Sequence, residues 1–200
     1  MKKIIFSIIT ASSILLAACN NNSSDKKENK TDTSQTAATN VDTSIKPTTA
    51  STATNQQASI REILAGYLQM KNAFAKDNSK EAAAAGNQMI KTFANFNKTS
   101  LTAEQAKIYN DIEDDAKEHA EHVGLNAGNI KHQREHFEML SKDIYQLVKT
   151  FGGGQKLYFD HCPMYNDGKG ANWISETKEI ANPYLGKSMP TCGTVKEELK

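Results

Sequence analysis

The chain has 200 residues, of which 24 are Lys or Arg and 23 are Asp or Glu, and its formal net charge is +1. This balance leaves no basic excess for a nucleic-acid-binding surface, so nucleic acid is not expected as a partner. The sequence carries no glycine-rich phosphate loop, and neither the Gly-x-Ser-x-Gly nor the His-Glu-x-x-His pattern occurs. We therefore do not expect an enzyme.

Residues 1–18 have the pattern of a lipoprotein signal peptide. Two lysines precede an apolar run that is too short to cross a bilayer but typical of a secretory signal. The run ends in Leu16-Ala17-Ala18-Cys19, and a lipoprotein signal peptidase cuts directly before such a cysteine. We predict that Cys19 becomes a fatty-acylated, palmitate-bearing N-terminus that anchors the protein to a membrane. Asn20 favours the outer membrane over inner-membrane retention. The sequence does not determine which side the domain faces, and we expect the periplasm rather than the cell surface.

A polar segment follows the acylated cysteine. Residues 20–57 consist mainly of Asn, Ser, Thr, Gln, Lys and Ala. Such a segment cannot bury enough apolar surface to offset the entropy lost on ordering, so we predict that residues 19–57 are a flexible tether. Its root-mean-square reach would be roughly 35 Å. Residues 58–200 remain, and they have the size of one domain with a single core.

Four helices are predicted in the first two-thirds of this domain. Apolar residues recur at helical spacing from Ile60 to Phe74, and an Ala-rich helix is expected from Ala82 to Phe96. Thr102 and Gln105 have the spacing of a capping box that begins the third helix. The fourth runs from about Asn129 to Phe151, where three glycines end it. The short connections predict a mainly α fold, an antiparallel four-helix bundle.

The tail after Lys156 is rich in turns, and we expect an irregular segment with one or two short strands, one of them at Leu157 to Asp160. Within it, two short segments each contain a cysteine and a methionine: Cys162-Pro163-Met164 and Met189-Pro190-Thr191-Cys192. Thiolate and thioether sulfurs are soft donors that select Cu(I), for which Ag(I) is a soft analogue. The pattern predicts a metal site formed by Cys162, Met164, Met189 and Cys192.

A disulfide is the alternative for the same two cysteines. An acylated lipoprotein lies in an oxidising compartment, where a pair of thiols suits a disulfide. Closing a loop of about 30 residues between Cys162 and Cys192 would stabilise the fold by about 3–4 kcal/mol. The protein would then be a structural or adaptor lipoprotein without metal. A disulfide needs no methionine, so the two neighbouring methionines favour the metal site. A site that alternates between both states also remains open.

Four of the five histidines flank the turn between the third and fourth helices. His119 and His122 lie near the end of one helix, and His132 and His136 near the start of the next. In an antiparallel pair these four side chains approach one another, which gives a possible Zn(II) or Cu(II) site independent of the tail. Histidines at such positions are also common as solvated or interface residues.

Three other residues have structural interpretations. We expect Trp173 and Tyr184 to pack the tail against the bundle, with the indole N–H and the phenol O–H bonded to the backbone. Arg134 is expected to bond carbonyls or a carboxylate where the tail meets the bundle.

A series of motifs resembles a known family. They are Gln133-Arg134-x-x-Phe137-x-x-Leu140-Ser141, Cys162-Pro163-Met164, Trp173-Ile174-Ser175, Asn182-Pro183-Tyr184-Leu185-Gly186, Met189 and Cys192-Gly193. Over residues 58–200 the chain is similar to a helical family of Gram-negative lipoproteins classed as a domain of unknown function. Related domains are fused to periplasmic adaptor subunits of copper and silver efflux pumps.

The resemblance implies copper or silver binding outside the cytoplasm, with Cys162, Met164, Met189 and Cys192 at matching positions. His122 matches the family's histidine on the third helix. We therefore predict a lipoprotein that binds Cu(I) or Ag(I) through the four sulfur residues, with His122, His119 or His161 completing the coordination. Its role would be to buffer the ion or to deliver it to a heavy-metal efflux adaptor or pump.

Overall fold

A computed structural model of the protein describes residues 49–200, with side chains from residue 56 onward. The predicted signal peptide, the acylated Cys19 and most of the predicted tether lie outside these residues. Within the described part, no helix has the length and apolar character that crossing a membrane requires.

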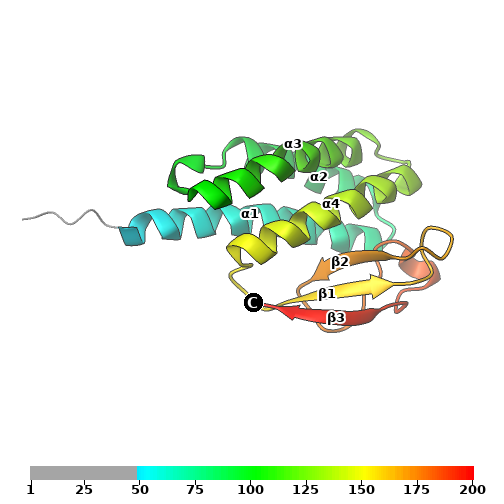
Figure 1. Cartoon of the computed structure of the whole chain (residues 1–200). Coiled ribbons are helices and arrows are strands. Elements are labelled where there is room, and N and C mark those ends of the chain that lie inside the picture. Colours follow the sequence, from blue (N-terminus) through cyan, green and yellow to red (C-terminus); the bar gives the residue numbers. More distant parts are fainter. Residues whose placement is uncertain (1–48) are drawn as a thin grey trace, which may run out of the picture. The chain divides into compact units, whose positions relative to one another are not determined.

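Four helices form the main body, which is the predicted bundle: α1 (Thr49–Ala75), α2 (Ser79–Ala94), α3 (Ala103–Leu125) and α4 (Ile130–Phe151). Consecutive helices pack against each other and are joined by short connections, one of which holds the 3-10 turn η1 (Lys98–Ser100) (Figure 1). The helix α1 begins before residue 58, so residues 49–57, which composition assigned to the tether, are helical.

The helix starts are fixed by side chains that accept hydrogen bonds from free backbone N–H groups. Asn78 caps α2 by accepting from the N–H of Glu81 at 3.2 Å. Thr102 and Gln105 form the predicted capping box at the start of α3, with N···O distances of 3.1 and 3.2 Å. Asn129 caps α4 in the same way. These caps confirm that the polar residues between the apolar stripes mark where the helices begin.

The helices α2 and α3 approach each other closely because of one glycine. A Cβ atom added to Gly86 would lie 2.6 Å from the carbonyl oxygen of Ala120, so a side chain there would push α3 away. The core itself consists of fully buried apolar side chains from all four helices, among them Ile63, Tyr67, Met89, Phe93, Tyr109, Ala116, Phe137, Leu140 and Ile144. The close approach between Gly86 and Ala120 sets the position of α3 beside the core.

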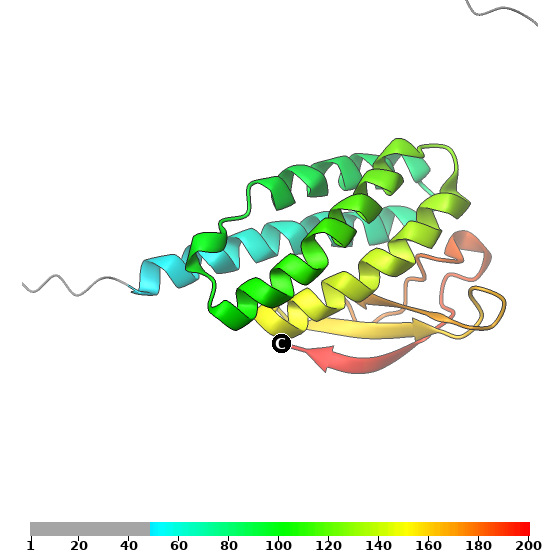
Figure 2. The ribbon, with the colours of Figure 1, turned by 45° about the horizontal axis from the view of Figure 1, so that its top comes forward.

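The tail folds into a three-stranded antiparallel sheet of order β2-β1-β3: β1 (Leu157–Cys162), β2 (Ala171–Ser175) and β3 (Thr194–Leu199). The strand β1 confirms the expectation at residues 157–160, and the sheet has one strand more than the one or two expected. The sheet lies along α4, and a long return with the 3-10 turn η2 (Gly186–Ser188) connects β2 to β3 (Figures 1 and 2).

Arg134 and Tyr184 attach the tail to the bundle. Arg134 donates to the carbonyl oxygens of Pro183 and Phe74 at 2.7 and 2.8 Å and pairs with Asp77. The Tyr184 hydroxyl donates to the carbonyl oxygen of Asn172 at 2.5 Å. Both roles are as predicted. Trp173 is fully buried against Tyr184, as predicted, but the expected backbone bond is wrong, because its indole N–H has no hydrogen-bond partner among the described residues.

Candidate functional site

Gln133 holds the turn between α3 and α4 in place. This fully buried side chain donates to the carbonyl oxygens of Val123 and Ser79 at 2.8 and 3.1 Å. It also accepts from the Ser79 hydroxyl at 2.6 Å, and that hydroxyl accepts from the N–H of Gly128 at 2.7 Å. The end of α3, the turn and the start of α4 are therefore tied to the start of α2. These bonds hold the backbone in place on both sides of the turn, and therefore fix where the side chains next to the turn begin.

The four histidines beside the turn come together, and we call them the histidine cluster: His119 and His122 from α3, His132 and His136 from α4. His119 and His136 face each other with their Nδ1 atoms 3.2 Å apart. The His122 ring stacks on His136 with centroids 4.1 Å apart, and the His132 and His136 rings are nearly perpendicular with centroids 4.7 Å apart. One ring nitrogen from each of His122, His132 and His136 lies within 4.8 Å of the others.

Two imidazoles of the cluster, those of His136 and His119, are held toward the neutral form that metal binding requires. Burial, followed by the influence of the neighbouring imidazoles, lowers the pKa of His136 to about 4. Burial also lowers the pKa of His119. Two carboxylates lie beside the outer rings. Glu135 contacts His132 Nδ1 at 3.3 Å, and Glu118 lies 3.8 Å from His122 Nε2. Such carboxylates can orient ligating imidazoles.

The spacing of the ring nitrogens is compatible with one ion after small side-chain rotations. Two imidazole nitrogens bound to one tetrahedral Zn(II) at about 2.0–2.1 Å lie about 3.3 Å apart. The His119 and His136 pair already has this separation. One nitrogen each of His122, His132 and His136 lies within 4.8 Å of the others, so these half-buried rings must move closer together to bind a common ion. All four histidines retain some exposure, which leaves room for that motion.

The second group of predicted ligands lies at the end of the sheet, and we call Cys162 and Cys192 the sulfur pair. Both are free thiols with their Sγ atoms 2.9 Å apart. Cys162 is fully buried, whereas Cys192 is partly exposed. The Cys192 thiol accepts from the N–H of Met164, and its own N–H donates to the carbonyl oxygen of Met189 at 3.2 Å. The backbones of Met164 and Met189 therefore contact Cys192 beside Cys162, and we call these four residues the sulfur corner.

The Sγ–Sγ distance in the sulfur pair is longer than in a disulfide and shorter than between two thiolates bound to one ion. A disulfide bond is about 2.05 Å long, so the sulfurs would approach by about 0.9 Å to form one. Two thiolates on one tetrahedral ion at about 2.3 Å lie about 3.8 Å apart, which requires a similar movement outward. The hydrogen bond with Cys162 raises the pKa of the Cys192 thiol. Met164 and Met189 are 58% and 42% exposed.

The predicted histidine ligands are not part of the sulfur corner. His161 is adjacent to Cys162 in β1, so their side chains point to opposite faces of the sheet. Its Nδ1 atom pairs with the Asn172 side chain at 2.8 Å. His119 and His122 contact His136 in the bundle. The predicted ligand residues thus separate into the sulfur corner, the histidine cluster and His161.

An unusual polar pair lies beside Cys162 on the same face of the sheet. Asp160 has no exposed surface, and neither carboxylate oxygen has a hydrogen-bond partner among the described residues. Burial raises the pKa of Asp160 to about 7. Its register partner on β2 is Trp173, whose indole N–H is also unpaired. The strand alternation of Tyr158, Asp160 and Cys162 is the sequence signal that would have placed this carboxyl inside.

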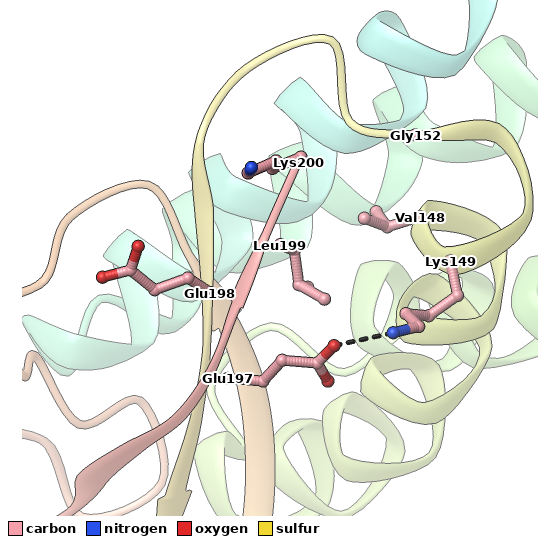
Figure 3. A pocket seen from close by; sticks show the side chains of 7 residues that line it. All are labelled: Val148, Lys149, Gly152, Glu197, Glu198, Leu199 and Lys200. Carbon is pink, nitrogen blue, oxygen red and sulfur yellow. Dashed lines mark hydrogen bonds and ion pairs between the residues drawn. The ribbon is translucent and has the colours of Figure 1, made fainter.

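A surface pocket of about 300 Å³ lies at the other end of β1, between the last turn of α4 and β3 (Figure 3). The Lys149 ammonium and the Glu197 carboxylate pair across it at 2.6 Å, and Leu199 points toward Val148. None of the predicted ligand residues lines this pocket. Lys149 pairs with Glu197 and Glu198 pairs with Lys156, so neither carboxylate of the pocket is free to bind a ligand.

Residues 63–156 match the model of a family described as "Protein of unknown function (DUF3347)". The match spans most of the bundle, includes the histidine cluster and ends just before β1. Comparisons with curated proteins and with solved structures found no significant match. The chain is therefore similar to a domain family of unknown function over the bundle, and the sulfur pair lies beyond the matched residues.

Proposed function

We propose that this domain binds a transition-metal ion through the histidine cluster. The observation that carries the proposal is the convergence of ring nitrogens from His122, His132 and His136, on two different helices, within 4.8 Å. Imidazole donors suit Zn(II), Cu(II) and Ni(II), whereas Mg(II) and Ca(II) prefer oxygen ligands. We therefore propose Zn(II) or Cu(II) as the ion, and a binding protein rather than an enzyme.

The arrangement of the cluster supports binding over a purely structural role. His136 contacts each of the other three imidazoles, and burial holds His136 and His119 toward the neutral form, in which a ring nitrogen can act as a donor. The depressed pKa of His136 agrees with this. The rings are half-buried and not sealed in the core, so an ion can reach them from the surface. Gln133 fixes the backbone beneath them, which limits the entropy lost when an ion binds.

A soft ion at the sulfur corner is the second candidate function. It is supported by the backbone contacts that bring Met164 and Met189 to Cys192, beside Cys162. With thiols reduced and moved apart by about 0.9 Å, the corner would offer two thiolates and two accessible thioethers to Cu(I) or Ag(I). The two candidate sites differ in donor type and therefore in the oxidation state of copper that they favour.

The cellular role that we propose is ion buffering or delivery to a heavy-metal efflux system at the outer membrane, on the periplasmic side. It is supported by the lipoprotein signal that ends at Cys19 and by the polar segment that follows. Figures 1 and 2 show the α3–α4 turn and the β1–β2 turn at the same end of the domain, so both candidate sites are near one end. A partner subunit could take up an ion from that end.

The test is a competition titration on full-length protein that carries Cys19→Ser to prevent acylation. Zn(II) and Cu(II) would be titrated against a chromophoric chelator, with a His132→Ala/His136→Ala variant beside it. We expect one ion per chain and at least a tenfold loss of affinity in the variant, about 1.4 kcal/mol. His161→Ala is the matched control and should bind as the parent does. Equal affinity in a double variant with unchanged circular dichroism would refute the histidine site.

The sulfur site has its own titration. Reduced protein would be titrated with Cu(I) under anaerobic conditions, and the same measurement would be made on Met164→Leu/Met189→Leu. Leucine is close to methionine in size but has no sulfur, so the fold should be unchanged. Loss of Cu(I) affinity in this variant supports the sulfur site, and unchanged affinity removes the methionines from it.

A further inference from the structure

We propose that the sulfur pair is a redox-active dithiol that undergoes thiol–disulfide exchange with external disulfides. This activity goes beyond metal binding and uses none of the residues of the histidine cluster. It would make the domain a two-electron donor when reduced and an acceptor when oxidised.

The distance between the two sulfurs is the first argument. Cys162 and Cys192 are separated by the whole length of β2 and the return segment, yet their Sγ atoms lie 2.9 Å apart. Both residues sit at the ends of ordered segments, one closing β1 and the other preceding β3. Formation of the bond needs an approach of about 0.9 Å, which side-chain rotation can supply.

The turn that carries Cys192 is held against β1. The Cys192 carbonyl oxygen accepts from the Asn182 amide at 2.6 Å, and its N–H donates to Met189. Gly193 follows with a φ of 145°, and a Cβ there would lie 2.8 Å from the Trp173 ring. Only a glycine lets the backbone pass this closely, so the sequence at this turn is suited to placing a thiol beside Cys162.

The two thiols differ in accessibility, which assigns their roles. Cys192 is partly exposed and can meet an external disulfide. Cys162 is fully buried and can reach only Cys192. An exposed attacking thiol with a buried second thiol suits exchange, because access decides which thiol meets the external disulfide and the second then acts on the mixed disulfide.

The reaction is balanced in two steps. The Cys192 thiolate attacks one sulfur of an external disulfide, R–S–S–R, forming a Cys192–S–R bond and releasing RS⁻, which takes up the proton that Cys192 lost. The sulfur of Cys162 then gives up its proton and attacks the Cys192 sulfur. This forms the Cys162–Cys192 bond and releases a second RS⁻, which takes up that proton. Two protein thiols are oxidised, and one external disulfide is reduced to two thiols.

The test uses full-length protein with Cys19→Ser, metal-free and reduced, exposed to oxidised glutathione at mildly alkaline pH. Mass spectrometry after acid quenching follows the products. We expect the parent to form the internal disulfide and to retain no glutathione, because Cys162 displaces it. Dithiothreitol should then restore both thiols.

Single variants test the assignment of roles. Cys162→Ser should accumulate a glutathione mixed disulfide at Cys192, whereas Cys192→Ser should react at least tenfold more slowly because Cys162 is buried. Equal rates in the two variants, or a parent that stays reduced or keeps glutathione, would overturn the proposal. His132→Ala/His136→Ala should exchange at the parental rate. A loss of metal binding in that variant and a loss of exchange in the cysteine variants therefore report on separate proposals.

Discussion

The histidine cluster and the sulfur pair are both groups of potential ligands, but they are assembled in different ways. The cluster lies on two consecutive helices joined by a short turn, so every contact in it is between residues close in sequence. The two residues of the sulfur pair come from distant segments: one ends β1, and the other lies in the return segment just before β3. Local geometry alone creates the first group, whereas the second exists only when the whole tail is folded. The two sites should therefore respond differently to the same perturbation.

The largest expected effect on the free energy of unfolding is at Phe137, which packs between the bundle and the tail. Phe137 is fully buried and contacts Tyr67 in α1 and Tyr184 in the tail, with ring centroids 5.1 and 5.6 Å apart. Phe137→Ala should lower the free energy of unfolding by about 3–5 kcal/mol, because it leaves a cavity at this junction. Chemical denaturation followed by circular dichroism measures it. A loss below about 1 kcal/mol would mean that tail and bundle are not packed through this ring.

A smaller loss of stability, caused by a substitution at Gln133, should distinguish the histidine cluster from the sulfur pair. Gln133→Ala removes the bonds that fix the α3–α4 turn and leaves buried carbonyls unpaired, so we expect a loss of about 1–3 kcal/mol. Metal affinity of the histidine cluster should fall, and the rate of glutathione exchange should not change. Arg134→Ala, one residue further along, is the matched control that weakens the attachment of the tail instead. If both variants affected both sites equally, the two regions would not be independent.

The buried carboxyl of the tail predicts a pH dependence opposite in sign to that of His136, whose lowered pKa makes stability rise as the pH increases from about 4 to 6.5. Burial raises the pKa of Asp160 from 3.8 to about 7, so between those values the folded protein holds a proton that the unfolded chain releases. Stability contributed by this residue is therefore complete below pH 4 and declines as the pH rises toward 7. Asp160→Asn should remove that decline and raise the free energy of unfolding at pH 8 by about 1–3 kcal/mol.

The measurement is denaturant unfolding at several pH values between 4 and 8. The control is Asp167→Asn, an exposed aspartate in the β1–β2 turn, which should leave the profile unchanged. Part of the decline will persist in Asp160→Asn because burial also raises the pKa of Asp143 to about 7. An Asp160→Asn profile identical to that of the parent would show that Asp160 has a partner in solution.

The smallest effect on stability is expected at Met164. Its side chain is 58% exposed, so Met164→Leu should change the free energy of unfolding by less than about 0.5 kcal/mol. Cu(I) affinity should nevertheless fall at least tenfold if the thioether is a ligand, while glutathione exchange continues. Met139→Leu, on α4, is the control. If Met164→Leu bound Cu(I) with the affinity of the parent, Met164 would not be a ligand. The proposed redox role of the sulfur pair would be unaffected.

The sequence was sufficient for the bundle because its signals are local. The capping box at Thr102 and Gln105 and the apolar spacing located the helices, and helix geometry brought the four histidines together. The strand β3 escaped prediction because its segment, Thr194–Leu199, alternates exposed and half-buried residues and carries several charges. Its pairing with β1 is a tertiary effect that no local pattern encodes.

The candidate site was predictable only in part. The two cysteine sulfurs lie 2.9 Å apart and the backbones of Met164 and Met189 contact Cys192, but this arrangement depends on the path of the return segment. His161 was expected near Cys162 because they are adjacent in sequence, and strand alternation separates their side chains. Strand alternation could have placed Asp160 inside, but its position opposite Trp173 became apparent only from the register of β1 and β2.

The sheet order β2-β1-β3 has a consequence for the time course of folding. The helices and the β1–β2 hairpin depend on contacts between neighbours in sequence and can form early, whereas β3 must find β1 across the long return segment. We therefore expect the two thiols to meet late, after the bundle is complete. Pulsed alkylation during refolding would follow this, with Cys162 and Cys192 becoming protected after the helical signal is recovered. Protection of both thiols before that signal would rule out this order.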